Sequence, residues 1–142
     1  MDKRVTRVFL IYAEEDYRFC DLLISQARSS KLAVEFAHMQ VKQPWVPRWK
    51  GLCRARVREC NGAIVLMSKK THEAAGVKWE LECACEGQLP ILGIFVNQGE
   101  KGPVPEEIRD ATVIEWDWPE IAKFIHLLDS GSLAGGSAGS VG

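Results

Sequence analysis

Short apolar runs alternate with helix-type segments along most of the chain, and this alternation constrains the fold more than any other feature. Five runs have the length and the β-branched or aromatic content of strands, at Arg7–Tyr12, Leu32–Ala37, Ala63–Met67, Ile91–Val96 and Thr112–Trp116. Helical spacing of apolar residues occurs between and after them, near 16–27, 49–60, 77–87 and 118–128. Strands that alternate with helices form a parallel sheet with helices on both faces. We therefore predict an α/β, flavodoxin-like three-layer sandwich with a five-stranded parallel sheet.

Length and charge narrow the possible functions. A chain of 142 residues predicts one domain, which we place at 1–129. The Gly/Ser-rich segment 130–142 is typical of a flexible linker or of a remnant appended to a natural chain, and it takes no part in the functional argument. The net charge of -1 gives no reason to expect nucleic-acid or membrane partners. Neither a membrane-spanning run nor a signal-peptide core is evident, so we expect a cytoplasmic protein.

Familiar catalytic and metal-binding motifs are absent from the sequence. The five cysteines include no C-x-x-C pair, so we expect no metal site and mostly buried thiols. The first apolar run is followed by Ala13-Glu14-Glu15-Asp16 and not by a glycine-rich turn. Acidic side chains at this position argue against a Rossmann dinucleotide site, because the pyrophosphate of such a cofactor approaches bare backbone.

The segment from Ala63 to Glu86 holds the first candidate for chemistry. Its apolar run stops at Ser68, a polar loop follows, and a helix is predicted from about Val77. This spacing places Glu80 in the first turn of a helix, beside the carboxyl end of a buried strand, where open α/β sheets bind ligands. A glutamate at a helix start is also a favourable partner of the helix dipole, so spacing alone leaves both roles open.

The flavodoxin-like topology predicts a crevice between the ends of the first and third strands, here Tyr12–Asp16 and Met67–Lys70. Two further glutamates, Glu82 and Glu86, lie on the same predicted helix as Glu80. They are four residues apart and so share one face, which we expect to be exposed. Glu80 is the glutamate closest to the crevice.

Trp45 and a basic helix are the other candidates for ligand or partner binding. Trp45 lies between Pro44 and Pro47, where no periodicity predicts burial. Stacking on a base or nicotinamide ring and packing under its own loop are both compatible with this position. The basic residues of segment 48–58 predict a solvated helix face in preference to a phosphate-binding or partner-binding surface.

Several blocks of the sequence resemble a known family. Arg7–Asp16 (RVFLIYAEED) resembles the opening of a TIR domain, and residues 49–96 (WKGLCRARVRECNGAIVLMSKKTHEAAGVKWELECACEGQLPILGIFV) are similar to TIR-like proteins of the bacterial Thoeris antiphage system. The ending Val113–Trp118 (VIEWDW) fits the same group. The resemblance extends over nearly all of residues 4–129.

This resemblance implies an enzyme that consumes NAD+ as a substrate and needs no bound cofactor. The expected reaction is cleavage of the nicotinamide–ribose bond, which gives a cyclic ADP-ribose-type signal or ADP-ribose. The family's catalytic glutamate maps onto Glu80, and the expected substrate-binding residues are Tyr12, Ala13, Asp16, Trp45, Ser68 and Trp79. A chain of this length leaves no room for an effector domain, so we expect a separate effector protein to respond to the product, and self-association is possible.

Gly76 is a departure from the family pattern. Many TIR enzymes carry a tryptophan four residues before the catalytic glutamate, whereas this chain has Gly76 there and Trp79 directly before Glu80. Independently of Gly76, a non-catalytic interaction module is the main alternative, since many TIR domains act by homotypic assembly. A nucleotide-binding sensor of the same fold is a third interpretation.

Overall fold

The fold is built around a parallel sheet at the centre of the chain. The computed structural model describes residues 5–131. Its sheet has five strands in the order β2-β1-β3-β4-β5, every pair of them parallel. The strands are β1 (Thr6–Tyr12), β2 (Val34–Ala37), β3 (Gly62–Met67), β4 (Ile91–Phe95) and β5 (Thr112–Glu115). The predicted α/β, flavodoxin-like sandwich is therefore confirmed, while the tail expected at 130–142 lies outside the described residues from residue 132 onwards.

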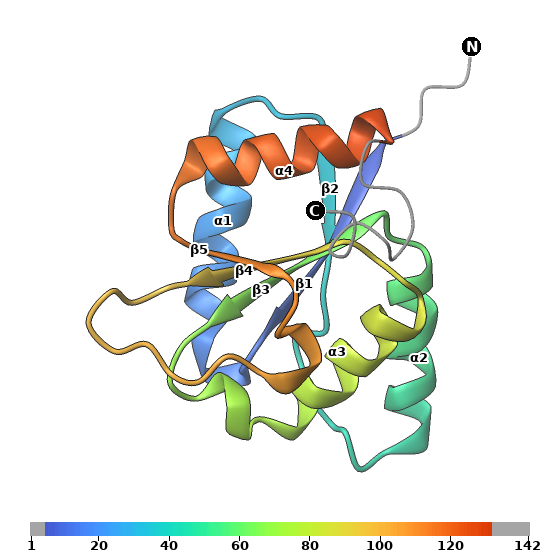
Figure 1. Cartoon of the computed structure of the whole chain (residues 1–142). Helices are drawn as coiled ribbons and strands as arrows, with labels where there is room; N and C mark the ends of the chain where they lie inside the picture. The colour runs from blue at the N-terminus through green and yellow to red at the C-terminus, as the bar shows by residue number, and fades with distance from the viewer. Residues whose placement is uncertain (1–4, 132–142) are drawn as a thin grey trace.

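Two helices cover each face of the sheet (Figure 1). Helices α1 (Tyr17–Ser29) and α4 (Trp118–Ser130) lie on one face, and α2 (Pro47–Arg58) and α3 (Ala75–Glu86) lie on the other. Short 3-10 turns occur at η1 (Glu14–Asp16), η2 (Thr71–Glu73) and η3 (Glu106–Ile108). Within residues 5–131, no helix combines the length and the apolar character that crossing a membrane requires.

The central strands β1 and β3 supply side chains to both hydrophobic layers, because alternate residues of a strand point to opposite faces. Phe9 and Val65 face α2 and α3, whereas Leu10 and Ile64 face α1 and α4. Every residue of β3 is buried, as expected for a strand covered by helices on both sides. The cysteines are free thiols, of which four are buried and Cys85 is exposed.

Candidate functional site

The carboxyl ends of β1 and β3 lie side by side, with Tyr12 paired in register with Leu66. The chain leaves β1 through α1 on one face of the sheet and leaves β3 through α3 on the other. This divergence opens the crevice in which flavodoxin-like folds bind ligands. Tyr12 ends β1, Ala13 and Asp16 lie in the short segment that follows it, and Ser68 comes directly after β3. Four of the sequence-predicted residues therefore meet at this edge.

Asp16 and Ser68 join the two loops that follow these strands. The Ser68 hydroxyl donates to Asp16 Oδ2 at 2.6 Å and accepts from the Lys70 backbone N–H at 3.1 Å. The Ser68 backbone N–H donates to Thr71 Oγ1 at 2.8 Å. Because Asp16 and Ser68 are both buried, these bonds hold the loops in one arrangement beside Glu80's helix.

Glu80 lies in the second turn of α3, since that helix begins at Ala75. The prediction that Glu80 belongs to the first turn is therefore wrong. The residue before the helix, Ala74, makes no side-chain cap, so no capping residue in the sequence marked the true start. The helix dipole acts mainly within the first turn, and a role for Glu80 as a dipole partner accordingly loses its support.

Glu80 is completely buried and is paired with Lys42. The Lys42 Nζ lies 2.8 Å from Glu80 Oε2, and the two side chains are 6% and 0% exposed. The same ammonium lies 4.1 Å from the centre of the Tyr12 ring, a cation–π distance. Lys42 belongs to the irregular segment before α2, where no periodicity or motif in the sequence marks it as a site residue.

The second carboxylate oxygen of Glu80 has no partner. Glu80 Oε1 is buried and is the one buried side-chain polar atom without a hydrogen bond among residues 5–131. Burial raises the pKa of Glu80 to about 7, although Lys42 opposes this shift. A buried, half-satisfied carboxylate is energetically costly, and such groups occur preferentially at functional sites.

Tyr12 and His38 border the ion pair as neutral groups. Tyr12 Oη and His38 Nδ1 share a hydrogen bond of 2.8 Å. Burial raises the pKa of the Tyr12 phenol well above its usual value, and burial together with nearby Lys42 lowers the pKa of His38. Both rings are therefore uncharged at neutral pH, which leaves Glu80 and Lys42 as the charges that face each other here.

Gly76 leaves room for Lys42. A Cβ added at Gly76 would lie 3.1 Å from the Lys42 Cβ and 3.5 Å from its Cγ and Cδ. A tryptophan at this position would overlap the lysine side chain. The departure from the usual TIR pattern and the presence of Lys42 are thus two parts of one arrangement.

The two predicted aromatic residues, Trp45 and Trp79, lie in different surroundings. Trp79 Nε1 donates to the Lys50 carbonyl at 3.2 Å, and Lys50 Nζ and Arg54 Cζ each lie 5.0 Å from the Trp79 ring centre. These contacts place the Trp79 ring between α2 and α3. They also show that two basic residues of α2, Lys50 and Arg54, pack against this ring. Trp45 is 74% exposed and follows Lys42 by three residues.

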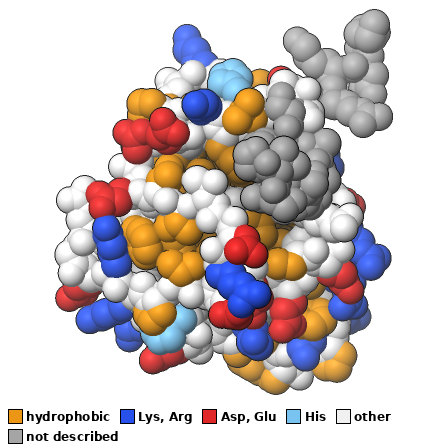
Figure 2. All heavy atoms as spheres, viewed as in Figure 1, with side chains coloured by type: hydrophobic (Ala, Val, Ile, Leu, Met, Phe, Trp, Pro, Cys, Tyr) orange, Lys and Arg blue, Asp and Glu red, His pale blue; other side chains and the backbone are white. Residues whose placement is uncertain are grey.

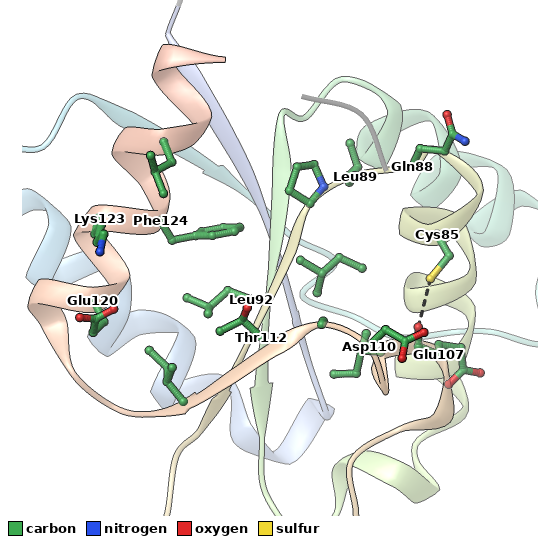
Figure 3. Close-up of a pocket in the computed structure, with 16 residues that line it drawn as sticks. Cys85, Gln88, Leu89, Leu92, Glu107, Asp110, Thr112, Glu120, Lys123 and Phe124 are labelled. Atoms are coloured by element: carbon green, nitrogen blue, oxygen red, sulfur yellow. Dashed lines mark hydrogen bonds between the residues drawn. The ribbon is translucent and has the colours of Figure 1, made fainter. Parts of the chain in front are cut away.

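An open groove lies elsewhere, near the amino ends of β4 and β5. This groove of about 520 Å³ lies between α4 and the C-terminal end of α3. Figure 3 shows Phe124 pointing from α4 into the groove, with Cys85 and Glu107 on the opposite wall. Figure 2 shows hydrophobic side chains gathered on this face of the molecule between charged ones. Neither Glu80 nor Lys42 lines the groove. Within residues 5–131, no cluster of three or more His, Cys, Asp or Glu side chains has the arrangement of a metal site.

Comparisons with known proteins identify a family and a fold. The family model described as Thoeris protein ThsB, TIR-like domain, matches residues 9–101. Similar solved structures are a diflavin flavoprotein A3 from Nostoc sp. (TM-score 0.51, 15% identity, 98% of this chain and 94% of that chain covered), a prokaryotic SEFIR domain (0.50, 15%, 88% and 90%) and a 3-dehydroquinate dehydratase-like protein from Bifidobacterium longum (0.50, 10%, 89% and 97%). At these identities they establish the flavodoxin-like fold alone. No curated protein matches the chain in sequence.

Proposed function

The chain belongs to the TIR-like domain family of the Thoeris protein ThsB, and from this premise we propose that it cleaves NAD+ at the nicotinamide–ribose bond. The product is a cyclic ADP-ribose-type signal or ADP-ribose, made in antiphage defence. The observation that carries the proposal is the buried carboxylate of Glu80, whose Oε1 has no partner, on the helix that follows β3 at the crevice of the sheet. Glu80 is the proposed catalytic residue.

The proposed chemistry needs a negative charge more than it needs an acid. Nicotinamide leaves NAD+ as a neutral molecule with the bonding electron pair, and positive charge develops on the ribosyl ring, as in glycoside hydrolysis. The ionised Glu80 carboxylate would stabilise that charge in a site sheltered from water. Addition of water gives ADP-ribose and one proton, whereas attack by a group of the same nucleotide gives a cyclic isomer and one proton. Exclusion of water decides between these products.

The other predicted binding residues receive distinct roles. We assign the Tyr12 ring and the small Ala13 to the wall of the nucleotide site, and the bonded pair of Asp16 and Ser68 to its fixed floor. Trp45 is exposed at 74% and is proposed to stack on an aromatic ring of the nucleotide. Trp79 supports the site indirectly, because it fixes α2 against α3.

A second candidate function is a non-catalytic assembly module. It is favoured by the complete burial of Glu80 against Lys42, since a closed ion pair needs no ligand, and by the exposure of Trp45 and Val41. In that case the exposed apolar side chains would contact a second copy of the chain. Concentration-dependent self-association without NAD+ turnover, also with an activator present, would support this alternative.

The test is chromatographic analysis of the products after incubation with NAD+. Wild type is expected to release nicotinamide together with ADP-ribose or a cyclic isomer, which would be read by a separate effector protein. Glu80→Gln keeps the side-chain shape and removes the charge, so we expect release to fall on the order of 100-fold or more. The matched control is Glu82→Gln, because Glu82 lies on the same helix with a side chain 48% exposed. Equal release by wild type and Glu80→Gln would contradict the proposed function.

A further inference from the structure

Lys42 fills the space next to the Glu80 carboxylate. Its ammonium is received by Glu80 Oε2 at 2.8 Å and by the face of the Tyr12 ring at 4.1 Å. A carboxylate and an aromatic face are the two groups that most favour a cation in a sheltered site. The same two groups therefore suit a pyridinium ring or a positively charged ribosyl group. Lys42 and such a ligand cannot occupy this place together.

The closed arrangement satisfies only half of the carboxylate. Lys42 contacts Oε2, whereas the buried Oε1 has no donor. A structural ion pair is most stable when further hydrogen bonds satisfy the remaining lone pairs, and this pair lacks them. A ribose ring, which offers two adjacent hydroxyl donors, would satisfy both oxygens. Exchange of Lys42 for a nucleotide would thus remove the unpaired buried atom.

Hydrogen bonds hold the backbone just before Lys42, so the side chain of Lys42 is the part that can move. Val41 O accepts a hydrogen bond of 2.6 Å from Trp49 Nε1, and His38 O accepts one of 3.0 Å from Arg56. The aliphatic part of Lys42 lies against Gly76, which has no side chain to interlock with it. A lysine side chain has several rotatable bonds, so it can leave the carboxylate without unfolding this segment.

We propose that Lys42 is an internal stand-in for the cationic part of the substrate, so that a nicotinamide nucleotide reaches Glu80 only by displacing the Lys42 ammonium. The inference rests on the proposed function in its choice of ligand. It makes the isolated chain a closed form of the enzyme, in which Lys42 competes with the substrate for one carboxylate. Only the molecules in which Lys42 has left Glu80 can bind the cationic nucleotide. The apparent dissociation constant is therefore the intrinsic one divided by the fraction of these open molecules.

The direct test is acetylation of lysines in the wild-type chain, read residue by residue by mass spectrometry. Lys42 should react on the order of tenfold more slowly than Lys78, because the Lys42 side chain is 6% exposed and that of Lys78 is 68% exposed. A non-cleavable carba analogue of NAD+ should accelerate acetylation of Lys42 severalfold and leave Lys78 unchanged. NADH, whose nicotinamide ring is neutral, should have no such effect. Unchanged or slower acetylation of Lys42 with the bound analogue would overturn the proposal.

Two variants make the test independent of catalysis. Glu80→Gln should accelerate acetylation of Lys42 without any nucleotide, since the charge that holds the ammonium is gone. An unchanged rate would contradict the closed ion pair between Lys42 and Glu80. Lys42→Met should bind the carba analogue on the order of tenfold more tightly than wild type, with Lys78→Met as the unchanged control. Absence of binding to both wild type and Lys42→Met would overturn the exchange. If the carba analogue accelerates acetylation of Lys42 but wild type releases no nicotinamide from NAD+, the proposed function is overturned and the Lys42 inference stands.

Discussion

The Glu80 site contains enclosed charges, whereas the groove beside β5 offers open space. At the Glu80 site, two opposite charges are enclosed, with side chains 6% and 0% exposed. The groove offers about 520 Å³, but its lining is mainly apolar and several of its charged residues lie in exposed positions. Enclosing a charge costs free energy, whereas an apolar groove at the edge of a sheet costs little. We therefore expect chemistry at the buried charges of Glu80 and Lys42, which cost free energy to enclose, and not in the groove.

Breaking the ion pair from the lysine side should give the largest effect on stability. Lys42→Met leaves the Glu80 carboxylate buried without a counter-charge, so we expect the free energy of unfolding at pH 8 to fall by about 3–5 kcal/mol. Lys123→Met, at the exposed wall of the groove, should change it by less than about 0.5 kcal/mol. Urea unfolding of both variants measures the contrast.

The double variant Lys42→Met, Glu80→Leu sharpens this result. Replacement of both charges by apolar side chains should recover most of the loss, because a buried ion pair is often matched in stability by well-packed apolar residues. Similar losses for Lys42→Met and Lys123→Met would show that the enclosed pair and the groove do not differ as described.

The pH dependence of stability should show the burial of Glu80. The pKa of this carboxyl rises from 4.5 to about 7 on folding, so the folded state holds a proton that the unfolded chain has released between these pH values. The contribution of Glu80 to stability is therefore full below about pH 4.5 and is lost as the pH rises towards 7. We expect Glu80→Gln to remove a decline on the order of 2 kcal/mol between pH 5 and pH 8. Parallel profiles for wild type and Glu80→Gln in urea unfolding would contradict the raised pKa.

Two helical glycines give a smaller and opposite pair of effects. Gly51 on α2 has open space around it, with nothing within 4 Å of an added Cβ. Gly51→Ala should stabilise the protein by about 0.5–1 kcal/mol, because alanine favours a helix. Gly76→Ala should destabilise it by about 1 kcal/mol, since the new methyl group meets Lys42. Thermal or urea unfolding checks both signs, and in a Lys42→Gly background, which removes the Cβ at position 42, Gly76→Ala should become stabilising.

The sequence was sufficient for the fold because its signals are local. The buried run Gly62–Met67, the Pro-bounded irregular segment and the helical periodicities each depend on residues close together in the chain. The position of Glu80 on the helix after β3 could also be predicted, since it follows from strand and helix order. Its exact turn could not, because Ala74 and Ala75 carry no capping signal.

The partner of Glu80 was beyond prediction for a physical reason. Lys42 acquires its role through a contact across 38 positions of the chain, and nothing in its own neighbourhood distinguishes it from a surface lysine. Gly76 was noticed as a departure, yet its meaning depends on the same contact. Trp79, predicted among the binding residues, packs against α2 through contacts with Lys50 and Arg54, and these contacts also lie far apart in the sequence.

If Glu80 is the catalytic residue, a nicotinamide nucleotide binds at Glu80 and not in the groove beside β5. The most direct measurement is an NMR titration of the wild-type chain with the non-cleavable carba analogue of NAD+, which follows the backbone amides. We expect the largest changes in residues 39–46 and 74–80, while Ile114, Phe124 and Leu127 in the groove remain unchanged. Changes centred on those groove residues, with residues 39–46 and 74–80 unaffected, would contradict it.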